Sequence, residues 1–208
     1  MLDIISASPQ NDRQGAPLSD DEISALRASS PRLARDDYAA LLAYLHHTGH
    51  PYHAFYDFPH SENSLVLQAN AKCVTEIDIG GLKYSCEVAH EAQSLVLFQH
   101  PRVPEAQDIG RIQTIWGIPL DGCLRYFLVV RPHKALSQAE QECGPYLAYP
   151  GFECRLVDAE LMPDSIIIEP HHLITHVFGL LLEKGSYEIP RATLACNTSF
   201  RRRRQQAQ

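Results

Sequence analysis

Histidine is the side chain with the most evident capacity for chemistry here, because eleven histidines occur and several are clustered. Glu169, His171 and His172 are close together, and His176 follows His172 at a spacing of four. Two imidazoles at that spacing beside a carboxylate resemble half of a metal site or an acid/base pair. One hypothesis is therefore an enzyme with a site at Glu169, His172 and His176. The alternative is that these histidines border a buried strand, since residues 166–168 are all isoleucine.

A second group of histidines follows a helical pattern. His46 and His50 are four residues apart and would share one face if the helix continued. Pro51 ends the helix there, and no cysteine or carboxylate at ligand spacing completes a tetrahedral metal set. We expect the polar end of a helix, where imidazolium interacts favourably with the helix dipole.

Several well-defined catalytic and binding motifs are missing. The sequence has no G-x-G-x-x-G, no P-loop, no G-x-S-x-G, no H-E-x-x-H and no EF-hand loop. Six cysteines are present, and no two of them have C-x-x-C spacing, which argues against a zinc ribbon and a thioredoxin-like site. We therefore assign no catalytic residue, no cofactor and no metal, and we favour a protein that is not an enzyme.

Trp116 is the single tryptophan and lies in a predicted strand. Such a residue usually packs in a core, although beside Tyr126 at the surface it would form a wall of a peptide or methyl-lysine pocket. Arg125 and Arg131 bracket the apolar run 126–130 and most simply mark the ends of a buried strand.

Charge is distributed unevenly along the 208 residues, whose formal net charge is −7. Removing the consecutive Arg201, Arg202, Arg203 and Arg204 leaves 14 basic groups against 25 acidic ones, so residues 1–200 carry −11. An acidic body repels phosphate backbones, and DNA or RNA binding by the folded part is not expected. The four arginines are the candidate contact for an anion or nucleic acid, or a nuclear-localisation signal, or a solvated terminus.

The domain organisation follows from composition. Residues 1–18 are polar and predict a flexible leader, 19–200 a single domain and 201–208 a basic tail. Within the domain, 19–50 form a helical arm and 64–200 are mostly β. The sequence contains neither a signal-peptide pattern nor a membrane-spanning run, so we expect an intracellular protein with reduced thiols.

The helical arm has clear boundaries. Ser19 and Glu22 have capping-box spacing, which predicts a helix from there to about Ser29, before Pro31. Asp36 or Asp37 is expected to cap a second helix. That helix has an apolar stripe at helical spacing, formed by Tyr38, Leu41, Leu42 and Leu45.

Residues 73–88 contain the clearest local signal, two alternating runs around Gly80-Gly81. A two-residue loop pairs Ile79 with Leu82 and Ile77 with Tyr84. The same register, extended outward, pairs Thr75 with Cys86 and Cys73 with Val88, all on one face. The opposite face takes Glu76, Asp78, Lys83, Ser85 and Glu87.

Further strands are predicted over 65–67, 94–99, 110–118, 124–131, 152–158 and 165–169. Ser137 and Glu140 repeat the capping-box spacing, and residues 171–182 fit either a helix or a strand. The fold class is therefore α+β and mostly β: an antiparallel curved sheet or a small β-barrel, with an N-terminal helical hairpin.

Five stretches of the chain carry a family resemblance. They are 38–49 (YAALLAYLHHTG), 81–90 (GLKYSCEVAH), 109–133 (IGRIQTIWGIPLDGCLRYFLVVRPH), 149–158 (YPGFECRLVD) and 166–176 (IIIEPHHLITH). In this order they resemble an uncharacterised domain family of mushroom-forming fungi, whose members are often associated with transposable-element proteins, including those of KDZ-type transposons. The resemblance implies no catalytic residue, cofactor or substrate. By analogy it implies a barrel like those of BAH or SH3 modules.

The leading prediction is a non-catalytic protein-interaction module, transposon-derived and chromatin-associated, in the nucleus. An acidic surface suits basic partners such as histone tails. The first alternative is a nucleic-acid-associated protein whose contacts come from the arginine tail. The second is the histidine-centred enzyme described above. Nothing in the sequence predicts the identity of the partner or the oligomeric state.

Overall fold

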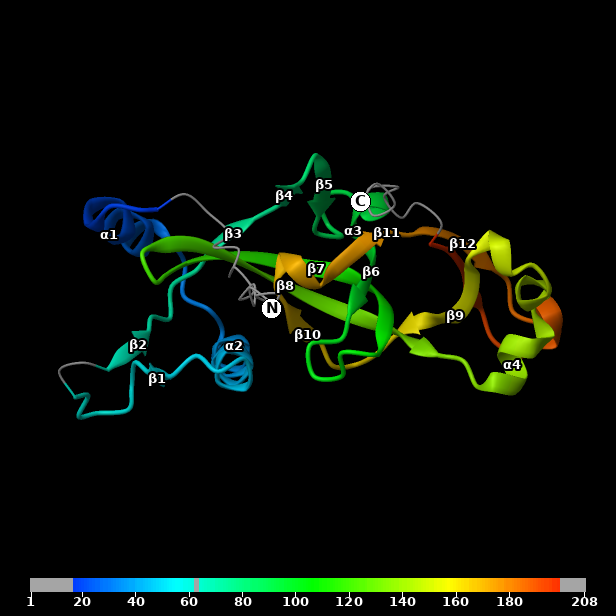
Figure 1. Cartoon of the computed structure of the whole chain (residues 1–208), viewed down its shortest axis with the longest axis horizontal. Helices are drawn as coiled ribbons and strands as arrows, with labels where there is room; N and C mark the ends of the chain where they lie inside the picture. Colours follow the sequence, from blue (N-terminus) through cyan, green and yellow to red (C-terminus); the bar gives the residue numbers. More distant parts are fainter. Residues whose placement is uncertain (1–16, 62–63, 199–208) are drawn as a thin grey trace, which may run out of the picture.

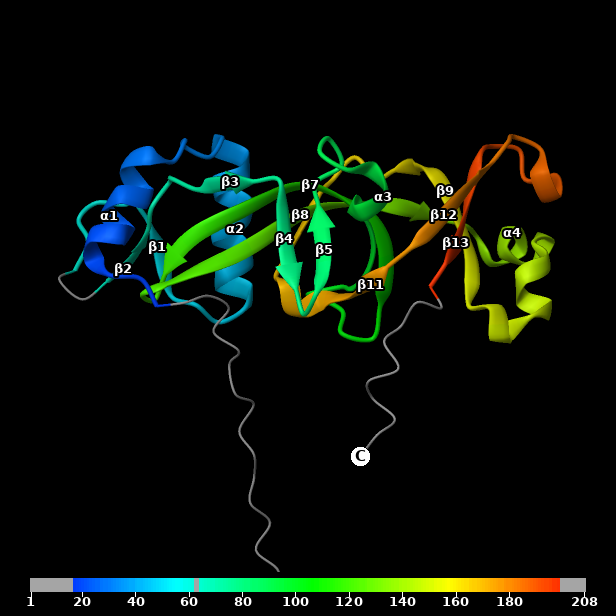
Figure 2. The same cartoon turned by 90° about the horizontal axis from the view of Figure 1, so that it is seen from above.

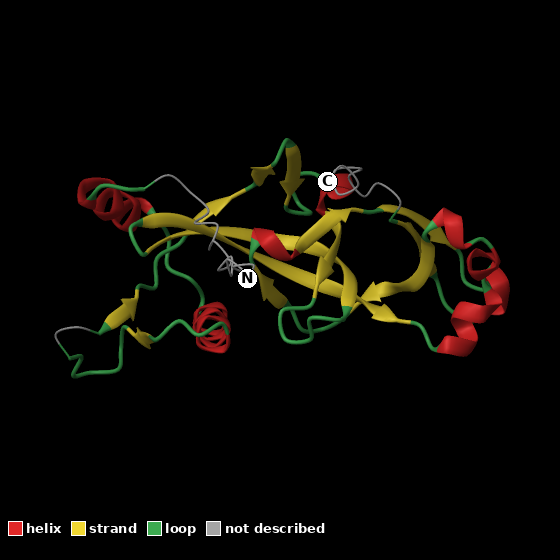
Figure 3. Ribbon diagram, in the orientation of Figure 1, coloured by secondary structure: helices red, strands yellow, loops and turns green. Residues whose placement is uncertain are grey.

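A long antiparallel hairpin forms the spine of the molecule in the computed structural model, which describes residues 17–61 and 64–198 (Figure 1). The longer helical segments lie towards the two ends, and strands with short helical segments between them fill the middle (Figure 3). The helices are α1 (Asp20–Ser29), α2 (Arg35–His47), α3 (Glu91–Ser94) and α4 (Gln138–Cys143). The 3₁₀ turns are η1 (Pro145–Ala148), η2 (Pro150–Phe152), η3 (Pro170–His172) and η4 (Ser186–Glu188).

The strands are β1 (Tyr52–Ala54), β2 (Leu65–Leu67), β3 (Lys72–Val74), β4 (Glu76–Ile79), β5 (Leu82–Ser85), β6 (Leu95–Gln99), β7 (Gln107–Leu120), β8 (Cys123–Ala135), β9 (Cys154–Leu161), β10 (Ile166–Ile168), β11 (Leu173–His176), β12 (Phe178–Leu182) and β13 (Thr193–Asn197). Every strand predicted after the double glycine is present. Strands β7 and β8 extend beyond both predicted ends, and β9 begins two residues later than predicted and ends three residues later. The ambiguous residues 171–182 form η3 and two strands.

The spine consists of β7 and β8, joined by Asp121 and Gly122 with φ of 52° and 73°. Positive φ at both central residues is the conformation that gives a two-residue hairpin the twist of its strands. The pairing shifts between Ile112 and Thr114, which marks a β-bulge at Gln113. The bulge places Ile112 and Ile115 in the same apolar cluster although they are three residues apart.

The two faces of the spine are covered by different elements. One face, with Trp116, Ile118 and Phe127, packs against the buried side chains of α2. The other face, with Ile115 and Leu128, packs against the β4–β5 hairpin, which lies on the opposite side in Figure 1. Alternation along the strands therefore gives the spine two apolar faces.

The predicted register of the double-glycine hairpin is confirmed near the turn, where Ile77 pairs with Tyr84 and Ile79 with Leu82. The outermost predicted pair is wrong. Cys73 pairs with Trp116 of β7, and Val88 is 91% exposed in a turn. The chain leaves the hairpin because β7 satisfies the backbone groups of β3 there. Ser85, on the opposite face of the hairpin, is buried and donates to Gln93 Oε1.

Both helices of the predicted arm are present, but they make unequal contributions to the core. The capping box at Ser19 is confirmed, and α1 buries no side chain. The second helix buries Tyr38, Leu41 and Leu45 of the predicted stripe. Its N-cap is Ala34 without a side-chain bond, so the predicted Asp36 or Asp37 cap is wrong. Both aspartates lie in the first turn, where the helix dipole favours them.

The main sheet is open, curved and antiparallel. Of the two predicted forms, the curved sheet is therefore confirmed and the small barrel is not formed. Its strand path runs β11-β6-β7-β8-β9-β13-β12, with β10 and β3 paired to β8 and β7. The two ends of the path, β11 and β12, are consecutive in the chain and are separated by Val177. Residues 173–182 therefore pair with β6 through β11 and with β13 through β12. Because β11 and β12 do not pair with each other, the sheet does not close into a barrel. The fold is α+β and mostly β, as predicted.

At the end opposite α1, three strands carry a small lobe. Strands β9, β13 and β12 are paired in that order, and β12 and β13 lie side by side in Figure 2. One face of these strands packs against Tyr146 of η1. The apolar cluster formed there includes Leu156 of β9 and Ala195 of β13. The capping box of α4 at Ser137 is confirmed.

Candidate functional site

The three residues of the predicted histidine site do not share one site in the structure. Glu169 lies between β10 and η3, and its Oε1 is 2.7 Å from Arg125 Nη2. The Glu169 amide donates to His172 Nδ1 at 3.3 Å, a local bond that closes η3. His176 instead stacks on Tyr84 of β5, with ring centroids 4.2 Å apart. A metal site or acid/base pair shared by His172 and His176 is therefore not assembled.

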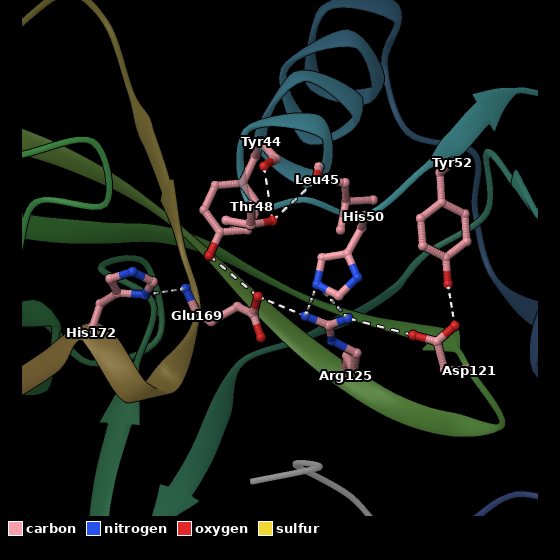
Figure 4. Close-up of polar contacts among 9 residues, drawn as sticks. All are labelled: Tyr44, Leu45, Thr48, His50, Tyr52, Asp121, Arg125, Glu169 and His172. Atoms are coloured by element: carbon pink, nitrogen blue, oxygen red, sulfur yellow. Dashed lines mark hydrogen bonds and ion pairs between the residues drawn. The ribbon is translucent and has the colours of Figure 1, made fainter. Parts of the chain in front are cut away.

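A polar network joins the two histidine groups through Arg125 (Figure 4). The Tyr44 hydroxyl donates to Glu169 Oε1 at 3.3 Å, and His50 Nε2 lies 3.4 Å from Arg125 Nη1. The same guanidinium lies 3.7 Å from Asp121, which accepts a hydrogen bond from Tyr52 at 2.8 Å. We call these residues the Arg125 network: Tyr44, His50, Tyr52, Asp121, Arg125 and Glu169.

The electrostatics of the Arg125 network favour a structural role. The side chains of Arg125 and Glu169 are only 15% and 10% exposed. Burial, reinforced by Glu169, raises the pKa of Tyr44, and burial together with Asp121 raises the pKa of Tyr52. Both phenols stay protonated and donate. Glu169 Oε1 is held by both Arg125 and Tyr44. The network fastens α2 and β1 to the spine.

Two other histidines, His172 and His46, are engaged close to the Arg125 network. His172 is neutral at physiological pH, because burial, followed by the neighbouring His171, lowers its pKa to about 4. His46 Nε2 donates to the Tyr52 carbonyl at 2.6 Å, just past the end of α2. Within residues 17–61 and 64–198, no three His, Cys, Asp or Glu side chains gather as metal ligands.

Sequence reasoning missed Arg125 as the centre of this network. It lies inside β8, as does Arg131, so the prediction that these two residues mark the ends of a strand is wrong. The Arg125 side chain turns to Glu169, 44 residues away. The pocket hypothesis for Trp116 is wrong. Its side chain is 3% exposed and packs with α2, while Tyr126, opposite Gly117, packs on the other face of the spine.

A pocket of about 280 Å³ lies at the small lobe, between η1, the start of β9 and the β6–β7 end of the sheet. Its lining includes Leu97, Tyr146, Leu147, Tyr149, Arg155 and Thr198. Burial, assisted by a hydrogen bond with Tyr187, raises the pKa of Tyr146 to about 12. Burial also raises the pKa of Cys154, another lining residue, so its thiol stays protonated and is a weak nucleophile.

Exposed apolar side chains gather on the same lobe. We call them the lobe surface: Leu147 (60% exposed), Tyr149 (67%), Phe152 (52%), Phe178 (64%), Leu180 (55%) and Tyr187 (38%). They are six of the thirteen large apolar side chains that are exposed among the described residues. Sequence analysis identified none of them as a site, because nothing in their spacing predicts that they share one surface.

Arg201, Arg202, Arg203 and Arg204, the predicted anion contact, lie outside the described residues, as does most of the predicted leader. In the part of the chain that is described, no helix combines the length and apolar character needed to span a bilayer. Comparison of the chain with protein-family models, curated proteins and solved structures gives no significant match in any of the three. The resemblance to a fungal family therefore stays a prediction.

Proposed function

We propose that this chain is a non-catalytic protein-interaction module that docks a protein partner on the lobe surface. The observation that carries this proposal is the concentration of exposed apolar side chains there, Phe178 and Tyr149 among them. Single exposed apolar residues are ordinary, but a contiguous group of them on one lobe typically marks a binding surface.

Several contacts indicate that the lobe surface is contiguous. Phe178 of β12 pairs with Asn197 of β13, whose side chain donates to the Phe152 carbonyl at 3.1 Å. The Tyr146 ring lies 6.2 Å from both Phe152 and Tyr187. These contacts connect η1, η2, η4 and the outer strands.

The edge of β12 supports the same proposal. This strand ends the sheet path, so its second edge pairs with no strand among the described residues. Its sequence, FGLLL, contains no charge and no proline, the residues that usually protect an edge from pairing with another chain. A partner strand added to this edge would gain main-chain hydrogen bonds as well as apolar contacts.

We also propose a transposon origin, an association with chromatin and a nuclear location. These three proposals rest only on the family resemblance and the arginine run. The arginine tail is the alternative contact, with nucleic acid. Deleting residues 201–208 tests it, since loss of DNA retention on that deletion supports the tail model.

The test of the proposed function compares two variants of the full chain for capture of partners from nuclear extract. Phe178→Ser with Leu180→Ser alters the lobe surface, and Phe58→Ser with Val88→Ser alters exposed apolar residues elsewhere, which are 79% and 91% exposed. We expect the first variant to lose a captured protein that the second retains. That protein, purified, must then bind the intact chain in calorimetry. Equal capture by both variants contradicts the proposal.

A further inference from the structure

We infer that two copies of this chain form a dimer by pairing their β12 strands edge to edge, antiparallel and about a two-fold axis. The inference rests on the proposed interaction function, because it names the partner that the edge of β12 accepts. Strand β13 pairs with one edge of β12, and no strand among the described residues pairs with the other. An uncharged edge without proline is a template for pairing with a second chain.

A two-fold axis between antiparallel strands restricts their register. The residue at such an axis lies opposite its own copy, and equivalent side chains of the two copies lie on the same face of the joined sheet. Of these registers, only the one centred on Leu180 pairs all five residues of β12 with β12 of the second copy. In that register Leu180 faces Leu180, Phe178 faces Leu182, and Gly179 faces Leu181.

Every pair on the face of the lobe surface is apolar in this register. Leu180 lies opposite Ala195 of β13, and Leu182 packs in the same apolar cluster as Ala195, so both leucines are on that face. Phe178 and Leu180 are 64% and 55% exposed in the single chain. Pairing would cover part of this apolar area, and apolar cross-strand pairs stabilise a sheet.

The other face of β12 offers a place for a second exposed leucine. Leu181 lies opposite Leu194 of β13 and is nevertheless 65% exposed. A Cβ at Gly179 would lie 2.8 Å from a Leu95 methyl and 3.1 Å from a Leu194 methyl, so these two leucines cover the glycine. Leu181 of the second copy, placed opposite Gly179, would therefore meet an apolar surface in place of water.

Charge also favours this arrangement, although the chain has a formal net charge of −7. Strand β12 carries no charge, and Glu183 and Lys184 follow it at one end only. In the register centred on Leu180, Glu183 faces Val177 of the second copy, which places the two Glu183 residues about 20 Å apart. That separation exceeds the Debye length of about 8 Å, so their repulsion is screened. Lys184 faces His176, which is neutral because burial lowers its pKa.

The lobe offers apolar area on the scale that a dimer needs. The four aromatic side chains of the lobe surface, Tyr149, Phe152, Phe178 and Tyr187, are between 38% and 67% exposed. Since an aromatic side chain buries roughly 150–250 Å², these four expose on the order of 400 Å² in each copy. A standard interface buries about 800 Å² per partner, and the exposed leucines of the lobe add to the aromatic area. We therefore expect a reversible dimer whose population depends on concentration.

Sedimentation velocity of the full chain over a wide range of protein concentration tests the inference. We expect the mean mass to rise with concentration from 23.3 kDa towards twice that value. Leu180→Lys places two lysines opposite each other at the axis, and Leu180→Glu does the same with two carboxylates. Like charges directly opposite each other destabilise paired strands. Each variant alone should dimerise at least about tenfold more weakly, the effect of roughly 1.4 kcal/mol.

Mixing the two variants supplies the decisive comparison. Lysine then faces glutamate at the axis, so the mixture should regain the dimer that each variant alone has lost. The matched control is Val88→Lys, at a residue 91% exposed in a turn outside the lobe, which should dimerise as the unaltered chain does. Circular dichroism of each variant checks that the fold is retained.

Three results would overturn the inference. They are a monomer at every concentration, a dimer that Leu180→Lys leaves intact, and a mixture of the two Leu180 variants that stays monomeric. If the chain is monomeric while the Phe178/Leu180 variant still loses its captured protein, the inference is wrong and the interaction function stands. If the dimer forms while both capture variants retain the same proteins, self-pairing stands and docking of a different protein is wrong.

Discussion

Arg125 and Glu169 form an ion pair of 2.7 Å between two segments of the chain that are 44 residues apart. The pair joins β8 to the segment before η3, and Tyr44 of α2 donates to the same carboxylate oxygen. Three separate elements are therefore tied at one point where little water reaches. The consequences for stability differ from those of the exposed ion pairs of the molecule.

Replacing Glu169 by Gln should lower the free energy of unfolding by about 3 kcal/mol, because Arg125 keeps its charge in a nearly buried position. Urea titration followed by circular dichroism measures this change. The matched control is Glu76→Gln, which breaks the ion pair between Glu76 and Lys83. The side chains of these two residues are 54% and 60% exposed. That change should cost about 0.5 kcal/mol. Similar losses of unfolding free energy in both variants would show that the buried charge of Arg125 does not need Glu169 for compensation.

Tyr44→Phe removes one hydrogen bond to Glu169 and leaves the ring contact with Phe127 in place. We expect a loss of about 1 kcal/mol, the usual net contribution of such a bond. The Tyr44→Phe and Glu169→Gln changes should not be additive, because they share an oxygen. If the double variant lost the sum of the two single-variant losses in unfolding free energy, Tyr44 and Glu169 would not act as one network.

Stability should fall when the pH drops below about 6.5. Burial lowers the pKa of His133, His172 and His176 in the folded state, and that of His172 to about 4. The unfolded chain therefore binds more protons between these values and about 6.5, so stability is full above pH 6.5 and is lost towards pH 4.

Urea titrations at pH 7.5 and 4.5 test this sign. In His172→Asn, the amide oxygen can still accept the Glu169 amide but does not titrate, so stability should fall less on acidification. His53→Asn, at an exposed histidine, should behave as the unaltered chain. A His172→Asn chain as acid-sensitive as that control would refute the assignment.

Gly110→Ala should destabilise the fold by about 2 kcal/mol. A Cβ at this position would lie 2.7 Å from the Arg131 carbonyl oxygen and 2.8 Å from a Val130 methyl, and the backbone of β8 cannot yield easily. Gly151→Ala is the control, since nothing lies within 4 Å of its Cβ position. Thermal unfolding of both variants measures the difference, and equal melting temperatures would contradict the close approach of β7 and β8.

Trp116 should report directly on the core between the spine and α2. Its side chain is 3% exposed, so native fluorescence should be blue-shifted and poorly quenched by acrylamide. Urea should shift the emission to longer wavelength together with the loss of circular dichroism. Strong quenching of the native chain would place Trp116 at the surface instead.

The sequence alone determined the features that depend on neighbours along the chain. Capping boxes at Ser19 and Ser137 and the alternation around the double glycine need only residues a few positions apart. Their geometry is set by local backbone preferences and by period, and these were predicted correctly.

The tertiary structure decided what depends on distant segments. The departure of Cys73 from the hairpin, the split between His172 and His176, and the centring of a network on Arg125 all follow from which strand each segment meets. A one-dimensional pattern gives the face on which a side chain lies but not the element that covers it. The gathering of Tyr149, Phe178 and their neighbours on one lobe has the same origin, because their proximity exists only after the sheet has curved.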